Sequence, residues 1–567
     1  MGLRGIIKFI FRRSFEILVI GVLLALLPNL PPYAKVTKPF SVTPAKPFTG
    51  KLALNNRLKD VEVWHKGDFH GPECFADYNG ELYTGILLGD VVKLTGEHIT
   101  PVVKFGKPCK SIHEESKCGR PLGLEFDNNG NLFVADAYYG LFQVNIKTGE
   151  KKVLVDPETE INGKKPRLFN SIVLASNGDI YWTDSSTDFG LEDGIFTVLS
   201  DPSGRLIHYD AKTKRNTVLV DGIHFANGVA LSDDEEFVIA AETVQNRIHR
   251  YYLKGPKKGT HDIFIDGLPG LPDNLKADGK GGFFVPLVMS TDEDHPILFQ
   301  SIGPFPLLRK AALRFMGIVE FLFKKLNEVY PNEFSEKTAH YLGSFASGHA
   351  LLPNHRVTLL RVDRSGNIVD SLHHLDSKIK GISEMHIFRD TLYLGSPFND
   401  YIARIPLDTI GWSDLKVDRV KRSAPTTPKP VTTTTQRPTT TTPRPTTTTP
   451  KPTTTTQKPT TTTPRPTTTT QRATTTTTTS KPTTTTAKPT TTTQKPTTTT
   501  PKPTAAPAKS INQKQAPPTA AKQEAPQARQ APPPQAKPTV APVKQQPPAS
   551  QTPPVKEKPQ TAQQVKN

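Results

Sequence analysis

A short pattern, glycine followed by any residue, an aliphatic residue or phenylalanine, and an aromatic residue, recurs along residues 70–410. The copies end at Tyr83, Phe133, Tyr181, Val238, Phe284 and Tyr393, and those ending at Val238 and Tyr393 are the weaker ones. The first five ends are 50, 48, 57 and 46 residues apart, with short alternating runs and Asp, Asn or Gly turns between them. Such a period is typical of one four-stranded propeller blade. Six copies predict an all-β fold, a six-bladed β-propeller over residues 61–412, and an irregular pair of β-sandwiches is the alternative.

The last interval is longer because it contains a segment with helical spacing. Within residues 305–329 apolar side chains recur every three or four positions, at Leu308, Ala311, Phe315, Ile318, Leu322 and Leu326. This spacing predicts a helical segment inserted into the propeller. Three interpretations stay open: the helix covers the channel, rests on a bilayer, or packs on the propeller face.

Polar residues stand at the same place in most repeats, ten or eleven residues before the aromatic end. They are Glu73, Asn170, Asn227, Asp273 and Asn274, whereas the second repeat has Leu122 and the sixth has Ser383 and Glu384. Equivalent positions of successive blades lie on one ring around a propeller axis, so we expect these side chains to converge. Carboxylate and amide oxygens are the ligands that Ca²⁺ prefers. The pattern therefore predicts one channel calcium ion, and the alternative is that each asparagine only caps a turn.

The C-terminal tail, residues 423–567, cannot form a core. It carries 30 of the 54 prolines and no aromatic residue, and it repeats Thr runs with a period of seven residues. This composition is typical of a disordered, O-glycosylated, mucin-like stalk, and a plain disordered linker is the alternative. Of the 71 basic and 53 acidic residues of the chain, the tail holds 20 and 2, so residues 1–422 hold 51 of each sign. The positive charge belongs to the tail, and nucleic acid is not an expected partner.

The N-terminus predicts entry into the secretory pathway. Residues 1–13 are basic and residues 14–30 are mostly apolar, without a clear cleavage site after them. We interpret them as a cytoplasmic segment and an uncleaved signal anchor, and a cleaved signal peptide is the alternative. Residues 31–60 are then a juxtamembrane linker. The expected localisation is the cell membrane or a secretory-pathway membrane, as a single-pass type II protein with its C-terminal domain extracellular or luminal.

A basic run separates the repeat region from the tail. It consists of Arg419, Val420, Lys421 and Arg422, and Ser423 follows. An exposed run with this spacing suggests a processing site at Arg419, Lys421 and Arg422, where cleavage would release the stalk.

The repeat region contains several motifs that point to one family. They include GPECFADYNGELYTG at residues 71–85, CGRPLGLEFDNNGNLFVADAYYGLF at residues 118–142 and HFANGVALS at residues 224–232. Together with IYWTDSS at 180–186, GLPGLPDNL at 267–275 and ISEMHIFRDTLYLGS at 382–396, they resemble the strictosidine synthase-like proteins of animals. The resemblance covers about residues 1–410. It implies a type II membrane protein with a six-bladed propeller, related to paraoxonases and gluconolactonases, in which a channel Ca²⁺ activates an ester or lactone.

Carried over by position, the resemblance places the calcium ligands on the five residues of the ring, Glu73, Asn170, Asn227, Asp273 and Asn274. It also implies a disulfide bond between Cys109 and Cys118, which leaves Cys74 as a buried thiol.

Three departures from the family pattern limit what can be carried over. Leu122 stands where paraoxonases have a channel histidine that acts as a base, so a histidine-based mechanism is not expected. Ser171 replaces the aspartate that would bind a second, structural calcium ion. Glu384 is displaced by one residue from the glutamate that strictosidine synthase uses, so strictosidine synthase activity is not expected.

Two functions from different classes remain. The first is a membrane-anchored, calcium-dependent hydrolase of aryl esters or lactones, in which Asp273 is the nearest candidate catalytic residue. The second is a non-enzymatic cell-surface mucin or adhesion protein on a propeller scaffold. The ring of polar residues favours the first, whereas the missing histidine and the long tail favour the second. The expected partners are a small ester or lactone, a membrane, and lectins that bind the O-glycans.

Overall fold

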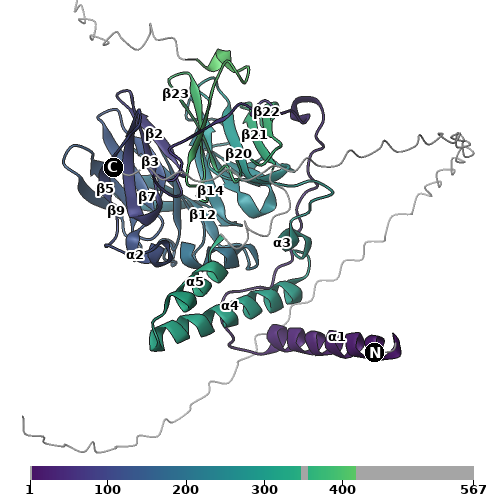
Figure 1. Ribbon diagram of the computed structural model, residues 1–567. Coiled ribbons are helices and arrows are strands. Elements are labelled where there is room, and N and C mark those ends of the chain that lie inside the picture. Colours follow the sequence, from purple (N-terminus) through teal and green to yellow (C-terminus); the bar gives the residue numbers. More distant parts are fainter. Residues whose placement is uncertain (1–2, 346–355, 417–567) are drawn as a thin grey trace, which may run out of the picture. The chain divides into compact units, whose positions relative to one another are not determined.

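The computed structural model describes residues 3–345 and 356–416. Most of these residues lie in short antiparallel strands, with a smaller helical part (Figure 1). The fold is therefore mostly β, in agreement with the β part of the predicted class. The predicted tail, residues 423–567, and the predicted processing site at Arg419, Lys421 and Arg422 lie outside the described residues.

The described strands form six antiparallel sheets, four of which consist of consecutive strands; helices interrupt the fifth, and the sixth combines the first strand of the chain with the last three. The first consists of β2 (Phe75–Tyr78), β3 (Glu81–Gly85), β4 (Asp90–Thr95) and β5 (His98–Lys104). The second consists of β6 (Pro121–Phe126), β7 (Asn131–Asp136), β8 (Gly140–Asn145) and β9 (Glu150–Val155). The third consists of β10 (Phe169–Leu174), β11 (Ile180–Asp184), β12 (Gly204–Asp210) and β13 (Arg215–Ile223). The fourth consists of β14 (Ala226–Leu231), β15 (Phe237–Glu242), β16 (Arg247–Tyr252) and β17 (His261–Ile265). The fifth consists of β18 (Gly270–Pro272), β19 (Lys276–Ala277), β20 (Phe283–Ser290), β21 (Val357–Val362) and β22 (Ile368–His374). The sixth consists of β1 (Glu62–Trp64), β23 (Glu384–Phe388), β24 (Thr391–Gly395) and β25 (Ile402–Pro406).

The aromatic ends of the sequence repeat fall on equivalent strands. Each lies in the strand next to the inner strand of its sheet, in β3, β7, β11, β15, β20 and β24; β20 pairs with both β18 and β19. The inner strands of neighbouring sheets contact one another, β2 with β6, β6 with β10, β10 with β14, and β14 with β19. Strand β23 contacts both β20 and β2, so these contacts pass through all six sheets and return to the first. The aromatic end of each repeat therefore marks the strand that pairs with the innermost strand of the sheet.

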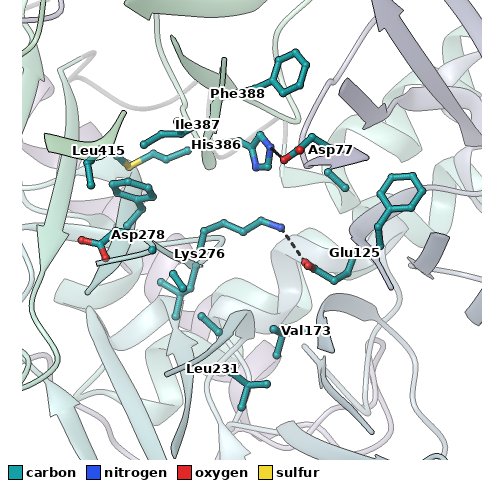
Figure 2. Close-up of a pocket in the computed structure, with 18 of the residues that line it drawn as sticks. Asp77, Glu125, Val173, Leu231, Lys276, Asp278, His386, Ile387, Phe388 and Leu415 are labelled. Carbon is teal, nitrogen blue, oxygen red and sulfur yellow. Dashed lines mark hydrogen bonds and ion pairs between the residues drawn. The ribbon is translucent and has the colours of Figure 1, made fainter. Parts of the chain in front are cut away.

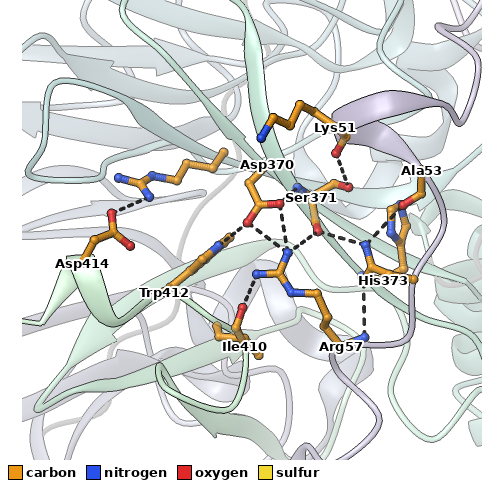
Figure 3. A network of polar contacts seen from close by, with 11 residues as sticks. Lys51, Ala53, Arg57, Asp370, Ser371, His373, Ile410, Trp412 and Asp414 are labelled. Atoms are coloured by element: carbon orange, nitrogen blue, oxygen red, sulfur yellow. Dashed lines mark hydrogen bonds and ion pairs between the residues drawn. The ribbon is translucent and has the colours of Figure 1, made fainter.

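The sixth sheet joins the two ends of the folded region. Its outer strand β1 precedes all the others in the chain, yet it pairs with β25, and Val63 lies opposite Ala403. A polar network around Asp370 holds the flanking segments (Figure 3). Both carboxylate oxygens of Asp370 lie 2.9 Å from Arg57 Nη1, and Trp412 Nε1 donates to the same carboxylate at 2.6 Å. Pairing of β1 with β25 thus joins the beginning of the folded region to its end within one sheet.

The apolar core is distributed between adjacent sheets rather than concentrated in one place. One cluster combines Leu124 and Val134 with Val91 and Val103 of the preceding sheet, and another combines Trp182 and Ile207 with neighbours such as Ala135. Each sheet thus buries both faces against its neighbours, which explains the buried aliphatic runs in the inner strands.

Helices follow strand β20 and cover one side of this arrangement. They are α3 (Leu298–Ser301), α4 (Pro306–Val329) and α5 (Glu333–Gly343), and α4 agrees with the predicted inserted helix. Pro306 occupies the first turn of α4, where its missing N–H is not needed. The short 3₁₀ helix η4 (Leu191–Val198) contacts α5.

The N-terminal region forms helix α1 (Leu3–Leu26), which contacts α4 (Figure 1). Among the helices of the described ranges, none combines the length and the apolar character needed to span a membrane. Residues 31–60, the predicted linker, are partly packed on the sheets. Val36 and Phe40 are buried, and the backbone and side chain of Thr37 donate to Asp201 at 2.7–3.0 Å.

Candidate functional site

Local irregularities in the first strands position the predicted ring residues. Asn170 and Asn227 both lie where the pairing register shifts, between residues 169 and 172 of β10 and between residues 226 and 229 of β14. Asp273 and Asn274 lie in the break between β18 and β19, which both pair with β20. Bulges and breaks of this kind re-aim side chains that a regular strand would point elsewhere.

Glycines allow the inner strands to approach closely at this level. A Cβ atom on Gly228 would stand 2.4 Å from the carbonyl oxygen of Asp273, and one on Gly123 would stand 2.7 Å from that of Asn170. A Cβ on Gly395 would stand 2.6 Å from the carbonyl oxygen of Glu73. The absence of a side chain at these positions therefore brings the ring residues of adjacent sheets together.

The side chains of the predicted ring are almost completely buried. Glu73, Asn170, Asn227, Asp273 and Asn274 are between 3% and 6% exposed. The charge of Glu73 acts on Asp273, and the side chain of Asn227 lies close enough to Asp273 to lower its pKa. Thus residues that are up to 200 positions apart along the chain are neighbours in the structure.

Asn170 is joined to the same cluster through strand β11. Its Nδ2 donates to Ser185 Oγ at 3.0 Å, and Ser185 Oγ donates to the carbonyl oxygen of Ala226 at 2.6 Å. Thr183 Oγ1 donates to the carbonyl oxygen of Asn227 at 2.7 Å. The hydroxyl groups of Thr183 in β11 and of Ser185, which directly follows this strand, therefore hold β10 and β14 at a defined distance from each other.

Three side-chain oxygens of the ring are buried and lack a hydrogen-bond partner in the described part of the protein. They are Asn170 Oδ1, Asn227 Oδ1 and Asp273 Oδ1. Asn274 differs, because its amide nitrogen is the atom without a partner. Buried polar atoms are nearly always hydrogen-bonded, so three oxygens without a donor at one place fit a cation better than a purely structural role.

The carboxylates of the ring are held in an unfavourable environment. Burial raises the pKa of Asp273 well above its usual value, and the charge of Glu73 raises it further. Burial also raises the pKa of Glu73 to about 7, although Arg120 opposes the shift. A divalent cation between them would remove this repulsion.

Sequence reasoning missed Arg120. This side chain is buried, donates to Gly71 O at 2.9 Å and to Glu73 Oε2 at 3.3 Å, and forms an ion pair with Glu115 at 3.7 Å. It lies only two residues before Leu122, the apolar position of the ring. The repeat does not single it out, because no other blade places a basic residue at this position.

Sequence reasoning recognised Glu384 as the sixth ring position but assigned it no role. Glu384 is 1% exposed, its Oε1 has no hydrogen-bond partner among the described residues, and it lies 3.9 Å from Lys276 Nζ. Burial raises its pKa to about 8, Lys276 opposes the shift, and Glu73 adds to it. Glu384 therefore forms an acidic cluster with the buried carboxyl groups of Glu73 and Asp273.

The described residues contain no group of three or more His, Cys, Asp or Glu side chains arranged to hold a metal ion. The predicted ligand set contains only two such residues, and its other three members are asparagines. The fit to a cation thus rests on amide oxygens, which suit Ca²⁺ and not the softer transition metals.

A cavity of about 730 Å³ lies at the far ends of the first strands (Figure 2). Lys276 Nζ approaches Glu125 Oε2 to 3.4 Å, and across the cavity His386 Nε2 lies 3.1 Å from Asp77 Oδ1. None of the five ring residues lines this cavity. Lys276 also reaches toward Glu384, so it separates the cavity from the acidic cluster.

An apolar cluster covers the opposite side of the ring. It contains Leu122, Phe225, Phe189 and Leu313, the last from helix α4, and Tyr138 packs against it. Leu122 thus contributes to a dry cover rather than to the polar ring. Such a cover excludes water from the ring residues, which strengthens electrostatic interactions there.

The cysteines are not part of a nucleophilic site. Cys109 and Cys118 form a disulfide bond with a Cα separation of 5.5 Å, and Cys74 is a buried free thiol. Burial raises the pKa of Cys74 to about 12, and the neighbouring Glu73 contributes to the shift. The thiol therefore stays protonated and unreactive.

Family profiles match two parts of the chain. The profile described as "Strictosidine synthase" matches residues 170–256, and "Strictosidine synthase-like, N-terminal" matches residues 50–94. "Adipocyte plasma membrane-associated protein Hemomucin" of Drosophila melanogaster is 45% identical over 425 residues, 74% of this chain and 73% of the relative. "Adipocyte plasma membrane-associated protein" of Mus musculus is 34% identical over 411 residues, 71% of this chain and 91% of the relative.

Solved structures with a related arrangement share little sequence with the chain. A gluconolactonase from Xanthomonas campestris has a TM-score of 0.40 at 15% identity, covering 67% of this chain and 99% of its own. Regucalcin from Agrobacterium tumefaciens, described as a calcium-binding protein, has a TM-score of 0.37 at 13% identity, covering 60% and 92%.

Proposed function

This chain belongs to the strictosidine synthase-like family, together with the adipocyte plasma membrane-associated proteins and hemomucin. On this basis we propose that it is a membrane-associated, calcium-dependent hydrolase of aryl esters or lactones. The observation that carries the proposal is the set of three buried side-chain oxygens without partners, of Asn170, Asn227 and Asp273.

The scaffold in this proposal is a six-bladed β-propeller. The six four- or five-stranded sheets, the cyclic contacts of their first strands and the pairing of β1 with β25 support it. In this arrangement the ring residues face a common axis, with the apolar cover at one end of the channel and the cavity containing Lys276 at the other.

Glu73, Asn170, Asn227, Asp273 and Asn274 would hold the calcium ion. When bound there, Ca²⁺ would supply a Lewis acid that polarises a carbonyl group and stabilises developing negative charge. Asn274 would turn its amide so that the oxygen faces the ion, because the nitrogen now faces the ring. Arg120 holds Glu73 in place through its ion pair.

The protein's own groups provide the remaining functions. Asp273 is the proposed acceptor for the proton of an attacking water, because it lies beside Glu73 and, unlike Glu73, forms no ion pair with a basic side chain among the described residues. The apolar cover with Leu122 and Phe225 would exclude other water from the reacting groups.

The proposal includes a membrane location for the chain. Residues 1–13 would lie on the cytoplasmic side, and the sheets and a glycosylated tail on the extracellular or luminal side. The basic residues before the apolar part of α1, such as Arg12 and Arg13, and the printed names of the relatives support this orientation.

The second candidate is a non-enzymatic surface mucin whose propeller serves only as a scaffold and whose glycans bind lectins. The ion pair of Arg120 with Glu73 favours it, because a basic side chain already compensates one carboxylate of the ring without a cation.

Hydrolysis of phenyl acetate by the full chain separates the two candidates. We expect calcium-dependent turnover that a chelator removes and that Asn227→Ala abolishes. Asn216→Ala serves as the matched control, because Asn216 accepts a hydrogen bond from Trp182 Nε1 at 3.2 Å in the outer part of a sheet. Equal rates with calcium, with chelator and in the Asn227→Ala protein would exclude the hydrolase and leave the scaffold function.

A further inference from the structure

Helix α4 buries several charged side chains and exposes a row of large apolar ones, beside which the charged pair Lys325 and Glu328 is also exposed. Its buried face includes Arg309, Arg314 and Glu320. Its exposed face includes Leu308, Phe315, Leu322, Leu326 and Val329, which are between 48% and 86% exposed. These positions are three, four or seven residues apart and so form one stripe along the helix. A helix on a water-soluble surface has the opposite arrangement.

The inner contacts of α4 fix its orientation. Arg309 donates to the carbonyl oxygen of Lys38 and lies 3.6 Å from Asp201, and Lys324 Nζ lies 2.8 Å from Asp193 Oδ1 in η4. Turning the helix to bury its apolar stripe would remove buried charged groups from these partners, at a high cost. The outward apolar face is therefore a property of the fold.

The same helix is attached to the C-terminal end of α1. Arg314 Nη1 donates to the carbonyl oxygens of Leu24 at 2.8 Å and Leu27 at 2.6 Å, which α1 leaves without helical partners. A Cβ atom on Gly317 would stand 2.2 Å from Pro32 Cδ, so α4 also contacts the segment that follows α1. Figure 1 shows α1 beside α4, in agreement with these contacts.

Helix α1 extends the apolar surface and adds positive charge. Its exposed side chains include Phe11, Phe15, Ile17 and Leu18, which are between 59% and 75% exposed. Its basic residues are Arg4, Lys8, Arg12 and Arg13, against one acidic residue, Glu16. In the proposed orientation the C-terminal end of α1 reaches the extracellular or luminal side of the membrane. Helix α4 is bonded to that end, so its apolar stripe lies at the same bilayer surface.

We propose that the outward face of α4, from Leu307 to Val329, lies in the interface of a lipid bilayer beside α1. A helix of 24 residues is about 36 Å long, and an interfacial helix buries its apolar side about 5–10 Å into the headgroup boundary. The face holds the folded domain against the membrane through a second contact besides α1. This inference rests on the proposed membrane association and adds to it the position of α4.

Tryptophan fluorescence tests the proposal in the full chain, reconstituted in vesicles of phosphatidylcholine and phosphatidylserine with brominated acyl chains. The native tryptophans Trp64, Trp182 and Trp412 are at most 6% exposed and provide a constant background. The emission added by Phe315→Trp is expected to shift to the blue and to be quenched by the brominated lipid. Val153→Trp, at a half-exposed position of the outer strand β9, is the matched control and is expected to stay unquenched.

A probe on α1, Phe15→Trp, distinguishes the possible failures. If this probe is quenched and Phe315→Trp is not, α1 meets the membrane and the proposal for α4 is wrong. If neither is quenched, both the membrane association and the position of α4 are wrong. Should Phe315→Trp fail to fold, Leu322→Trp probes the same stripe. Concentration-dependent dimerisation with unquenched probes on α4 would show that a second copy covers the face and would also overturn the proposal.

Discussion

Removing calcium is expected to lower the thermal stability of the full chain. Each buried polar atom without a partner destabilises the folded state by about 1–3 kcal/mol. A cation that binds the oxygens of Asn170, Asn227 and Asp273 would therefore remove a cost of roughly 3–9 kcal/mol. Part of this gain is offset by dehydration of the ion and by competition with Arg120 for Glu73.

The measurable stabilisation depends on the calcium concentration. At a hundredfold excess over the dissociation constant, a ligand that binds only the folded state adds about 2.7 kcal/mol. For a domain of this size we expect the midpoint of thermal unfolding to fall by roughly 5 °C when a chelator replaces calcium.

Thermal unfolding followed by circular dichroism measures this difference, with calcium, with magnesium and with chelator. Asn227→Ala should abolish the calcium shift, because it removes one of the three oxygens. Asn216→Ala should lower the midpoint in all conditions and keep the calcium shift. A midpoint that calcium leaves unchanged in the unaltered chain would refute the interpretation of the ring as a cation site.

Three further predictions concern the surroundings of the ring and the wider fold. Arg120→Met should destabilise the protein by about 3–5 kcal/mol in urea unfolding, because it leaves Glu73 buried without its basic partner; a loss below about 1 kcal/mol would contradict this reading. Gly228→Ala should lower the free energy of unfolding by about 1–3 kcal/mol and reduce the rise of the unfolding midpoint with calcium, because the new methyl group meets the backbone at Asp273. An unchanged midpoint with a full rise in calcium would show that the strands can separate there. Burial opposes ionisation of Glu242, but hydrogen bonds from the adjacent histidine and arginine outweigh it and lower its pKa to about 2. The lowered pKa of Glu242 stabilises the folded state by roughly 3 kcal/mol at a pH above the unfolded pKa near 4.5, and this stabilisation is lost as the pH falls toward 2. Urea unfolding at neutral and acidic pH should show this loss in the unaltered chain. The loss should be smaller in Glu242→Gln.

Much of the fold could be predicted because the repeat is local. The aromatic ends at Tyr83, Phe133 and Tyr181 lie on the second strand of their sheets, and the inserted helix begins and ends within one residue of the predicted segment. The break between β18 and β19 was not predicted. The apolar pattern of residues 270–277 is the same for one continuous strand as for two short ones. Only the pairing with β20 shows that the chain forms two strands there.

The candidate site was predictable to a similar degree. Equivalent positions in the repeat identified Asn170, Asn227 and Asp273 together, because a fold built from equivalent units places equivalent residues at the same depth. The repeat could not identify Arg120 or Lys276, since each occurs once and acquires its partner only when neighbouring sheets pack together.

The amino-acid sequence determined the number and order of the β units, the inserted helix and the polar positions, because alternation, helical spacing and repeat length are properties of neighbouring residues. Only the tertiary structure decided which oxygens remain without donors, which basic side chain approaches Glu73 and which face of α4 points outward. These features depend on distances between segments that lie from 47 to 271 residues apart along the chain, and packing of the whole fold sets those distances.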